Sequence, residues 1–285
     1  MISKVFIIGA TGYIGKKFLE TARELVTIPV YGTTTSGSGS LIQLRFDDLK
    51  AFDFNLFDDG CVTFVLAAIS APDICALEHD RASAVNVEGT AKFIAQVIQR
   101  GGRVVFFSSD TVYGARADEF DEKAACNPSG EYAVMKREVE QRFLGNASFK
   151  SIRLSYVFSR EDKFSRYLAG CVERNEEAEL FHPFYRAVVH RDDVIKGALA
   201  LAKHWDETPE QFVNFGGPEV LSRVEFAKCL QKIFLQHLKF KVTEPDDTFF
   251  ENRPRIIAMK SPVFTRLLGR TPSSLFEAAR IEFAT

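Results

Sequence analysis

Short apolar runs alternate with stretches of helical periodicity through the first half of this 285-residue chain. Short β-branched or aromatic runs bounded by turns predict buried strands, and apolar residues three to four positions apart predict helices. The predicted strands are residues 5–8, 28–31, 41–44, 62–67, 103–107 and 150–154. The predicted helices are residues 12–24, 82–99 and 131–144. This alternation predicts an α/β fold with a doubly wound parallel sheet that is covered by helices on both faces.

The second half of the chain has a less regular pattern. A helix is predicted at residues 192–203, and helices, short strands and loops are expected over residues 160–174, 184–190, 213–217 and 223–235. Four prolines interrupt the last forty residues and indicate loops: Pro245, Pro254, Pro262 and Pro272. We therefore expect a sheet-forming domain over residues 1–155 and a smaller C-terminal α/β lobe over 156–285. Segments near 184–217 are expected to return to the sheet.

Three glycines, Gly9, Gly12 and Gly15, lie between the first predicted strand and the first predicted helix. Glycine permits a tight turn there and lets backbone N–H groups approach a pyrophosphate, whose charge the helix N-terminus favours. A Gly-x-x-Gly-x-x-Gly turn between a strand and a helix predicts a Rossmann-type dinucleotide site. The predicted contacts in this turn are Gly9, Thr11, Gly12, Tyr13, Ile14 and Gly15.

The end of the second predicted strand bears on which dinucleotide is bound. An acidic residue that would hold the adenosine ribose hydroxyls is missing there, and Thr33, Thr34 and Ser36 follow instead. Hydroxyl groups tolerate a 2′-phosphate, which a carboxylate would repel, and Arg45 is the nearest candidate cation. The pattern favours NADP(H) and leaves NAD(H) open. A flexible polar loop would account for the same residues equally well.

Candidate acid–base residues follow later in the chain. Tyr132 and Lys136 are four positions apart and therefore share one face of a predicted helix. A lysine ammonium group beside a phenol is expected to lower the phenol pKa, although such a pair alone is common on solvated helices. The predicted strand 103–107 leads into Ser108, Ser109 and Asp110, at the edge where open α/β sheets bind ligands. The two segments together predict a catalytic site.

These motifs, in this order and spacing, resemble those of extended short-chain dehydrogenases/reductases, the NAD-dependent epimerase/dehydratase superfamily that acts on nucleotide sugars. The matching segments are the glycine turn and residues 65–68, 85–90, 108–114, 132–136, 189–194 and 214–219. The resemblance implies that Tyr132 is the general acid/base and that Lys136 tunes its pKa and binds ribose. It also implies that Ser109 polarises the substrate oxygen and that Asp110 belongs to the catalytic group.

The resemblance implies further contacts. Additional cofactor contacts are expected at Ala67, Ala68, Asn86, Ser108 and Tyr156. Substrate contacts are expected at Ser70, Ser109, Thr111, Tyr156, Arg186 and Arg253. The segment 153–157 is expected to line the nicotinamide and the sugar ring. The relatives form dimers, so a homodimer through the predicted helices 82–99 and 131–144 is implied.

Three reactions share this framework, and the residues after Ser109 help to separate them. Dehydratases of the family usually carry an Asp-Glu pair there, and epimerases usually have a small neutral residue at the first position. This chain has Asp110 and Thr111, as reductases similar to dTDP-4-dehydrorhamnose reductase do. We therefore expect reduction of an NDP-4-keto-6-deoxy sugar. A nucleotide-sugar 4-epimerase, a dehydratase and a non-catalytic NADP-binding regulatory subunit remain alternatives.

Composition excludes several other classes. Lys and Arg number 36 against 38 Asp and Glu, so no basic excess is available for nucleic acid or an anionic membrane. The five cysteines are odd in number and form no C-x-x-C pair, which favours a reducing, cytoplasmic location. The histidines show no H-x-x-x-H spacing, so no metal site is predicted. No apolar run is long enough for a membrane span or a signal peptide.

Overall fold

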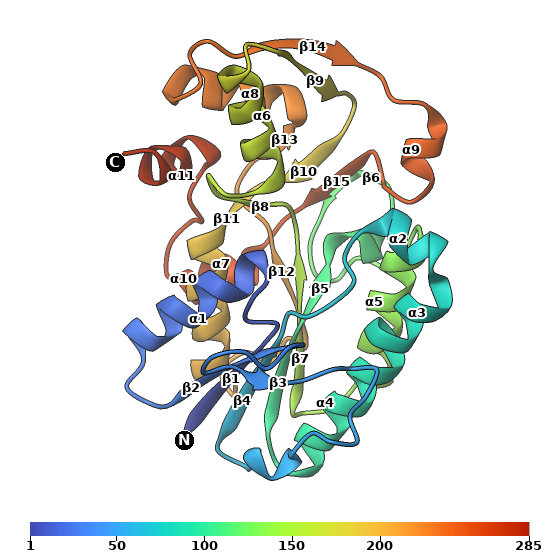
Figure 1. The fold of residues 1–285 in the computed structure, drawn as a ribbon, viewed down its shortest axis with the longest axis vertical. Coiled ribbons are helices and arrows are strands. Elements are labelled where there is room, and N and C mark those ends of the chain that lie inside the picture. Colours follow the sequence, from blue (N-terminus) through green and yellow to red (C-terminus); the bar gives the residue numbers. More distant parts are fainter. Residues whose placement is uncertain (285) are drawn as a thin grey trace.

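A seven-stranded parallel sheet forms the centre of the computed structural model, which describes residues 1–284 (Figure 1). Its strands follow the order β3-β2-β1-β4-β5-β7-β12. Their bounds are β1 Lys4–Ile8, β2 Val30–Thr34, β3 Ile42–Gln43, β4 Cys61–Val65, β5 Arg103–Ser109, β7 Phe149–Leu154 and β12 Phe212–Phe215. Since the chain winds outward in both directions from β1, the predicted doubly wound α/β fold is confirmed.

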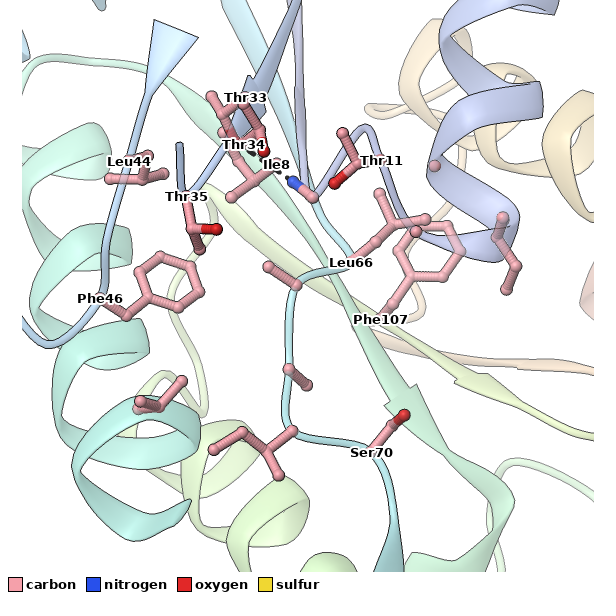
Figure 2. A pocket seen from close by; sticks show the side chains of 18 of the residues that line it. Ile8, Thr11, Thr33, Thr34, Thr35, Leu44, Phe46, Leu66, Ser70 and Phe107 are labelled. Carbon is pink, nitrogen blue, oxygen red and sulfur yellow. Dashed lines mark hydrogen bonds between the residues drawn. The ribbon is translucent and has the colours of Figure 1, made fainter. Parts of the chain in front are cut away.

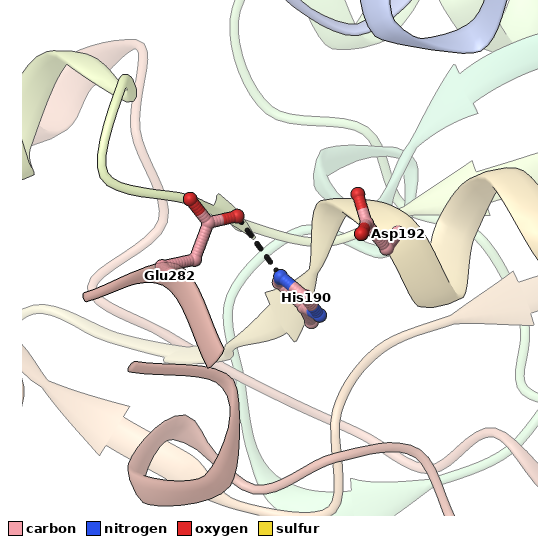
Figure 3. Close-up of side chains that lie close together, drawn as sticks. All are labelled: His190, Asp192 and Glu282. Carbon is pink, nitrogen blue, oxygen red and sulfur yellow. Dashed lines mark hydrogen bonds and ion pairs between the residues drawn. The ribbon is translucent and has the colours of Figure 1, made fainter. Parts of the chain in front are cut away.

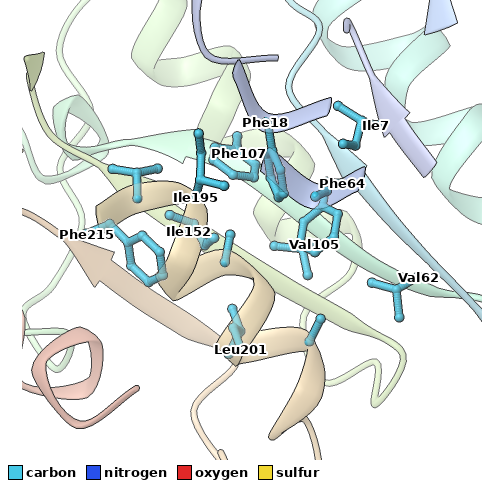
Figure 4. Packing of buried hydrophobic residues seen from close by; sticks show 14 of the residues in the cluster. Ile7, Phe18, Val62, Phe64, Val105, Phe107, Ile152, Ile195, Leu201 and Phe215 are labelled. Atoms are coloured by element: carbon cyan, nitrogen blue, oxygen red, sulfur yellow. The ribbon is translucent and has the colours of Figure 1, made fainter. Parts of the chain in front are cut away.

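Helices cover both faces of this sheet because successive residues of its strands point to opposite sides. Val105 and Phe107 of β5 belong to one core with Phe18 and Ile195, which Figure 4 shows packed together. Phe106 belongs to the core on the other face. The covering helices are α1 (Tyr13–Leu25) and α7 (Arg191–Lys203) on the first face, and α4 (Thr90–Gln99) and α5 (Glu131–Arg142) on the second.

The second strand lies later in the chain than predicted. It starts at Val30 rather than at residue 28, and it continues through Thr33 and Thr34, which we had expected in a loop. Both threonines are buried, and they pair with Ile42 and Gln43 of β3. Threonine is β-branched and packs well in a strand. The threonines at 33 and 34 therefore continue β2, although their polarity suggested that the strand had ended.

The predicted helix 82–99 is interrupted. Helices α2 (Pro72–Leu77) and α3 (His79–Ser83) come first, and a π-helical turn, Ala84–Gly89, then leads into α4. A side chain at Gly89 would meet the Phe46 carbonyl oxygen at 2.0 Å, so this turn packs directly on the segment after β3. Apolar spacing does not reveal a single π turn, because the periodicity on either side of it remains helical.

A smaller sheet stands above the carboxyl ends of the large one (Figure 1). It contains β13 (Val220–Ser222), β10 (Tyr185–Ala187), β15 (Ile256–Met259) and β6 (Arg116–Phe120). Strand β6 comes from the first half of the chain, between β5 and α5, and was not predicted. Two further parallel pairs are β8 (Val157–Phe158) with β11 (Val189–His190), and β9 (Glu177–Phe181) with β14 (Lys239–Thr243).

The remaining helices surround these short strands. They are α6 (Lys163–Glu173), α8 (Arg223–Ile233), α9 (Asp247–Glu251), α10 (Pro262–Leu268) and α11 (Leu275–Glu282). Pro245, Pro254 and Pro272 lie in connections between these elements, as expected, whereas Pro262 is the first residue of α10, where its missing N–H is tolerated. Across residues 1–284, no helix combines the length and the apolar character that a membrane crossing requires.

Candidate active site

A cavity of about 720 Å³ opens along the carboxyl edge of the large sheet. The ends of β1, β2, β5 and β7 and the segment after β4 form its walls, and Figure 2 shows their side chains around it. This is the edge at which open α/β sheets bind ligands, because the strand order reverses there.

The glycine turn forms one wall and has no room for a side chain at Gly9 or Gly15. Gly9 has a φ of +89°, and its N–H donates to Thr33 Oγ1 at 3.2 Å. A Cβ at Gly15 would lie 2.1 Å from the Gly9 carbonyl oxygen. Helix α1 begins directly after Gly12, which has no side chain to cap the first N–H groups. These groups can therefore receive a phosphate, so the turn fits a dinucleotide.

Most of the predicted cofactor contacts border this one cavity. The lining residues among them are Gly9, Thr11, Gly12, Tyr13, Ile14, Gly15, Thr33, Thr34, Arg45, Ala67, Ala68, Ser108, Tyr132 and Lys136. Ser70, predicted as a substrate contact, lines it as well. Within residues 1–284 the buried Oγ of Ser108 has no hydrogen-bond partner, which leaves one polar group on the wall unsatisfied.

Ser36, Tyr156 and Asn86 do not line the cavity. The Ser36 hydroxyl points to that of Ser38 at 3.5 Å. The Tyr156 hydroxyl donates to Asp162 at 2.6 Å, and the ring lies under the Arg223 guanidinium. Tyr156 therefore belongs to the C-terminal lobe rather than to the wall of this cavity.

Asn86 lies in the π-helical turn behind the wall and is buried. Its side-chain oxygen accepts from the Ile69 N–H at 2.8 Å, and its amide group donates to the Ile69 carbonyl at 2.9 Å. The Asn86 side chain thus fixes the position of the backbone that follows Ala67 and Ala68. That segment lines the cavity, so Asn86 supports the cavity wall from behind. We expected Asn86 to lie near the cofactor, and the structure places it one layer farther back.

Replacing Asn86 with alanine is expected to lower the free energy of unfolding by about 1–3 kcal/mol, since it leaves the Ile69 N–H and carbonyl unpaired. Urea unfolding followed by circular dichroism measures this change. Asn55 is exposed and serves as the matched control, for which Asn55→Ala should change stability by no more than about 0.5 kcal/mol. Equal effects in the two variants would contradict the role given to Asn86.

Tyr132 and Lys136 lie at the other end of the cavity, on α5. The Lys136 ammonium donates to the Phe107 carbonyl at 2.8 Å and lies 5.7 Å from the centre of the Tyr132 ring. Burial lowers the pKa of Lys136 to about 8. Burial also raises the pKa of Tyr132, and Cys75 and Asp110 raise it further. We expected Lys136 to lower the Tyr132 pKa, but in this structure burial dominates and the pKa lies above its ordinary value.

The residues after Ser108 form a compact hydrogen-bonded turn. Ser109 Oγ donates to Asp110 Oδ1 at 3.3 Å and accepts from the Thr111 N–H and hydroxyl at 3.2 and 2.9 Å. The other Asp110 oxygen accepts from Ser155 at 2.8 Å. Burial raises the pKa of Asp110, and nearby Arg186 opposes that shift. These residues do not line the large cavity themselves, but they follow its wall directly.

A second cavity of about 460 Å³ lies in the C-terminal lobe. It is lined by Phe164, Tyr167, Glu179, Phe181, Phe184, Arg223, Phe249 and Arg253. Arg253 pairs with Asp73 of α2, so this cavity meets the large domain at that contact. The predicted substrate contact Arg186 lines neither cavity. It is buried, and its terminal nitrogens donate to the carbonyls of Tyr185 and Pro254 at 2.6 and 2.7 Å.

A buried ion pair that we did not predict connects α5 to the sheet. Arg153 of β7 donates to Glu140 at 3.1 and 2.8 Å and to the Tyr113 hydroxyl at 2.8 Å. Leu154, its neighbour, does line the large cavity, whereas Arg153 points into this network. The network fixes the helix that carries Tyr132 against the strand beside β5. Motif spacing gave no signal for it, because Glu140 and Arg153 lie on different elements.

A second unpredicted cluster joins His190, Asp192 and Glu282, whose ligand-type atoms lie within 4.8 Å of one another (Figure 3). His190 Nε2 and Glu282 are 3.0 Å apart, and the other Glu282 oxygen accepts from the Arg160 N–H at 3.1 Å. These contacts attach the end of α11 to the start of α7. The cluster therefore has a structural role, because it connects the C-terminal helix to the body of the protein.

The protein is therefore a Rossmann-type α/β protein. Its doubly wound parallel sheet has a glycine turn and a cavity at the carboxyl edge, and a Tyr-x-x-x-Lys helix lies on the cavity wall. The chain belongs to the RmlD substrate binding domain family, whose family model matches residues 3–264. The resemblance identified from the sequence motifs is thereby confirmed.

Curated proteins resemble the chain in sequence, and solved structures share its fold. The chain is 26% identical to methionine adenosyltransferase 2 subunit beta of Xenopus laevis, over 85% of this chain and 76% of the relative. A structure described as a hypothetical dTDP-4-dehydrorhamnose reductase from Sulfolobus tokodaii superposes with a TM-score of 0.82 at 20% identity, covering 95% of this chain and 98% of that one. UDP-glucuronic acid 4-epimerase from Bacillus cereus superposes with a TM-score of 0.81 at 18% identity, covering 99% and 98%.

Proposed function

We propose that this protein is an NAD(P)H-dependent reductase of an NDP-4-keto-6-deoxy sugar. The observation that carries the proposal is that one cavity joins the glycine turn at one end to Tyr132 and Lys136 at the other. A dinucleotide bound along this cavity would have Tyr132 and Lys136 on the wall of the same site as its pyrophosphate. Structures of similar fold include proteins described as a reductase and as epimerases of nucleotide sugars, which supports the substrate class.

The chain's own residues suit the two ends of a dinucleotide. The backbone of the glycine turn and the start of α1 would hold the pyrophosphate. Ala67 and Ala68 would leave room for the adenosine side, and Lys136 would hold the nicotinamide ribose. The free Ser108 hydroxyl is available on the same wall. A bound reduced nicotinamide would supply the hydride that the substrate carbonyl carbon accepts.

Reduction of a carbonyl group needs a proton donor beside the substrate oxygen. A carbonyl oxygen that gains a hydride at its carbon must also gain a proton, and Tyr132 is the acid positioned for it. The raised pKa of Tyr132 keeps the phenol protonated at neutral pH. Lys136, whose pKa is lowered to about 8, still carries a proton there and stabilises the phenolate that remains after transfer.

The second cavity suits the nucleotide part of the substrate. Phe181, Phe184 and Phe249 offer flat apolar surfaces for a base, and Arg223 and Arg253 offer positive charge for a diphosphate. Arg253 is already paired with the exposed Asp73, which a diphosphate could replace. We therefore retain Arg253 as a proposed substrate contact and add Arg223, whereas Arg186 is better described as a partner of Asp110.

The test is consumption of NADPH, with NADH in parallel, by purified protein that is given dTDP-4-keto-6-deoxy sugars. We expect stoichiometric loss of the reduced-nicotinamide absorbance and a sugar product reduced at C4. Protein without sugar, and sugar without protein, are the controls. Cofactor binding without any oxidation would overturn the reductase proposal.

Two alternatives remain, each with its own observation. Conversion of a nucleotide sugar without net loss of reduced cofactor would indicate an epimerase, as in the similar Bacillus cereus structure. Binding of the cofactor with no conversion of any sugar would favour a non-catalytic subunit. That second alternative is supported by the curated relatives, which are described as a subunit of methionine adenosyltransferase.

A further inference from the structure

One histidine and two carboxylates meet between the C-terminal helix and the body of the protein. His190 is the last residue of β11, Asp192 lies in the first turn of α7, and Glu282 is the last residue of α11. One ligand-type atom from each of the three lies within 4.8 Å of the other two. Imidazole nitrogen and carboxylate oxygen are atoms with which proteins bind zinc and similar divalent cations. The three side chains therefore supply the donors of a metal site.

One oxygen of this set is unsatisfied. Asp192 Oδ1 is buried and has no hydrogen-bond partner within residues 1–284. Figure 3 shows Asp192 beside His190 without a bond to it, whereas Glu282 is bonded to the ring. A buried polar atom without a partner costs free energy, and an ion is one of the explanations for such an atom in a folded protein. Asp192 Oδ1 is therefore a second observation that points to a cation.

The charges around the three side chains favour a cation. The ligand oxygens of Asp192 and Glu282 lie within 4.8 Å of each other, so the two carboxylates repel unless a positive charge lies between them. Arg191 directly follows His190, but its Nη1 is bound to Glu161 at 2.6 Å. The C-terminal end of α11 carries a partial negative charge and the N-terminal end of α7 a partial positive one. Because these helix ends oppose each other, the two carboxylates decide the balance.

We propose that His190, Asp192 and Glu282 bind one zinc ion, which ties α11 to the start of α7. A neutral histidine and two carboxylates balance the charge of a divalent cation, and a set that includes imidazole favours zinc over magnesium. Zinc binds such atoms at about 2.0–2.2 Å, which places them about 3–3.5 Å from one another. His190 Nε2 and Glu282 are already 3.0 Å apart, so the Asp192 side chain makes most of the adjustment. This proposal is independent of the cofactor and substrate proposed above.

Zinc binding would exchange one of the existing contacts. The metal takes the lone pair of Nε2, so the His190 ring carries its proton on Nδ1 and the hydrogen bond to Glu282 is given up. The other Glu282 oxygen keeps its bond from the Arg160 N–H at 3.1 Å, which holds the carboxylate in place. Sequence spacing did not predict this site, because Glu282 is distant in the chain from the other two ligands.

Thermal unfolding of the full chain tests the proposal, after dialysis against a chelator and then against metal-free buffer. Isothermal titration with Zn²⁺ should give one ion per chain and its dissociation constant. At a free Zn²⁺ concentration of about 100 times that constant, we expect the unfolding midpoint to rise by about 4–8 °C. Mg²⁺ at the same concentration should change the midpoint by less than about 1 °C, since it prefers an all-oxygen octahedral site.

Two substitutions of the same kind separate this site from other pairs of histidine and acid. Asp192→Asn removes one anionic ligand and keeps the histidine–glutamate bond. It should weaken zinc binding at least about tenfold, while the midpoint in chelator stays within about 2 °C of that of the unaltered protein. Asp80→Asn is the matched control, because Asp80 lies beside His79, which also contacts Glu131, but all three side chains are exposed. This variant should keep the full zinc shift.

The measurements in chelator distinguish a ligand from a side chain that only supports the fold. A ligand contributes only to the zinc-dependent part of the midpoint. A lower midpoint of Asp192→Asn in chelator, with an unchanged affinity for zinc, would make Asp192 a structural residue and overturn the proposal. Absence of any zinc shift in the unaltered protein would overturn it as well. Loss of the shift in Asp80→Asn would place the ion at the exposed histidine, and stronger stabilisation by Mg²⁺ than by Zn²⁺ would exclude zinc as the ion.

Discussion

Replacement of Tyr132 with phenylalanine is expected to lower kcat for reduction of the keto sugar by about 10²–10⁴-fold, because the substrate oxygen loses its proton donor. Cofactor affinity should change little, since the phenylalanine ring keeps the shape of the wall and Lys136 remains bonded to the Phe107 carbonyl. Initial rates of NADPH oxidation give kcat, and NADPH fluorescence titration gives the dissociation constant.

A matched control separates the missing hydroxyl from a general effect of the substitution. Tyr31 lies on β2, is exposed, and does not border either cavity described here. Tyr31→Phe should therefore keep the rate of the unaltered protein. If Tyr132→Phe turned over substrate at the same rate as Tyr31→Phe, the phenol would not be the acid, and another proton donor would have to be sought near Asp110.

Replacement of Glu140 with glutamine is expected to lower the free energy of unfolding by about 3–5 kcal/mol. Glu140 is fully buried and accepts from Arg153, Arg137 and Ser151, so the change leaves a buried guanidinium without its counter-charge. Urea unfolding monitored by circular dichroism measures the loss.

The control for this prediction lies on the same helix. Glu138 pairs with Arg142, and both side chains are partly exposed. Glu138→Gln should therefore cost less than about 1 kcal/mol. A Glu140→Gln variant as stable as Glu138→Gln would mean that Arg153 finds another partner or reaches solvent. The buried network would then contribute little to holding α5 against the sheet.

The glycine turn and the Tyr132–Lys136 helix could be predicted because their residues are close together in the chain. A strand, a turn and a helix fix Gly9, Gly12 and Gly15 relative to one another, whatever the rest of the fold does. The same holds for two side chains four positions apart on one helix. The parallel sheet follows from the alternation of strands and helices, since such connections bring successive strands side by side.

Features that depend on contacts distant in the chain could not be predicted. Asn86 holds Ile69, and Arg153 meets Glu140, only because the sheet and its helices pack as they do. Likewise, the predicted helix 82–99 joined the end of α3, the π-helical turn and α4 into one element, because apolar periodicity does not register the break between them. The direction of the net Tyr132 pKa shift was out of reach for a related reason, because the spacing of two residues on a helix does not tell how deeply they are buried.

The path of β6 limits how this protein can be divided. Strand β6 leaves the first half, joins β15 in the small sheet, and the chain then returns to begin α5. A fragment that ended near residue 155 would leave β6 without the strand beside it, and it would expose the edge of β7 that β12 now covers. Unpaired edges of this kind invite aggregation. Domain exchange with a relative is therefore better made at a surface loop than at the boundary suggested by the motifs.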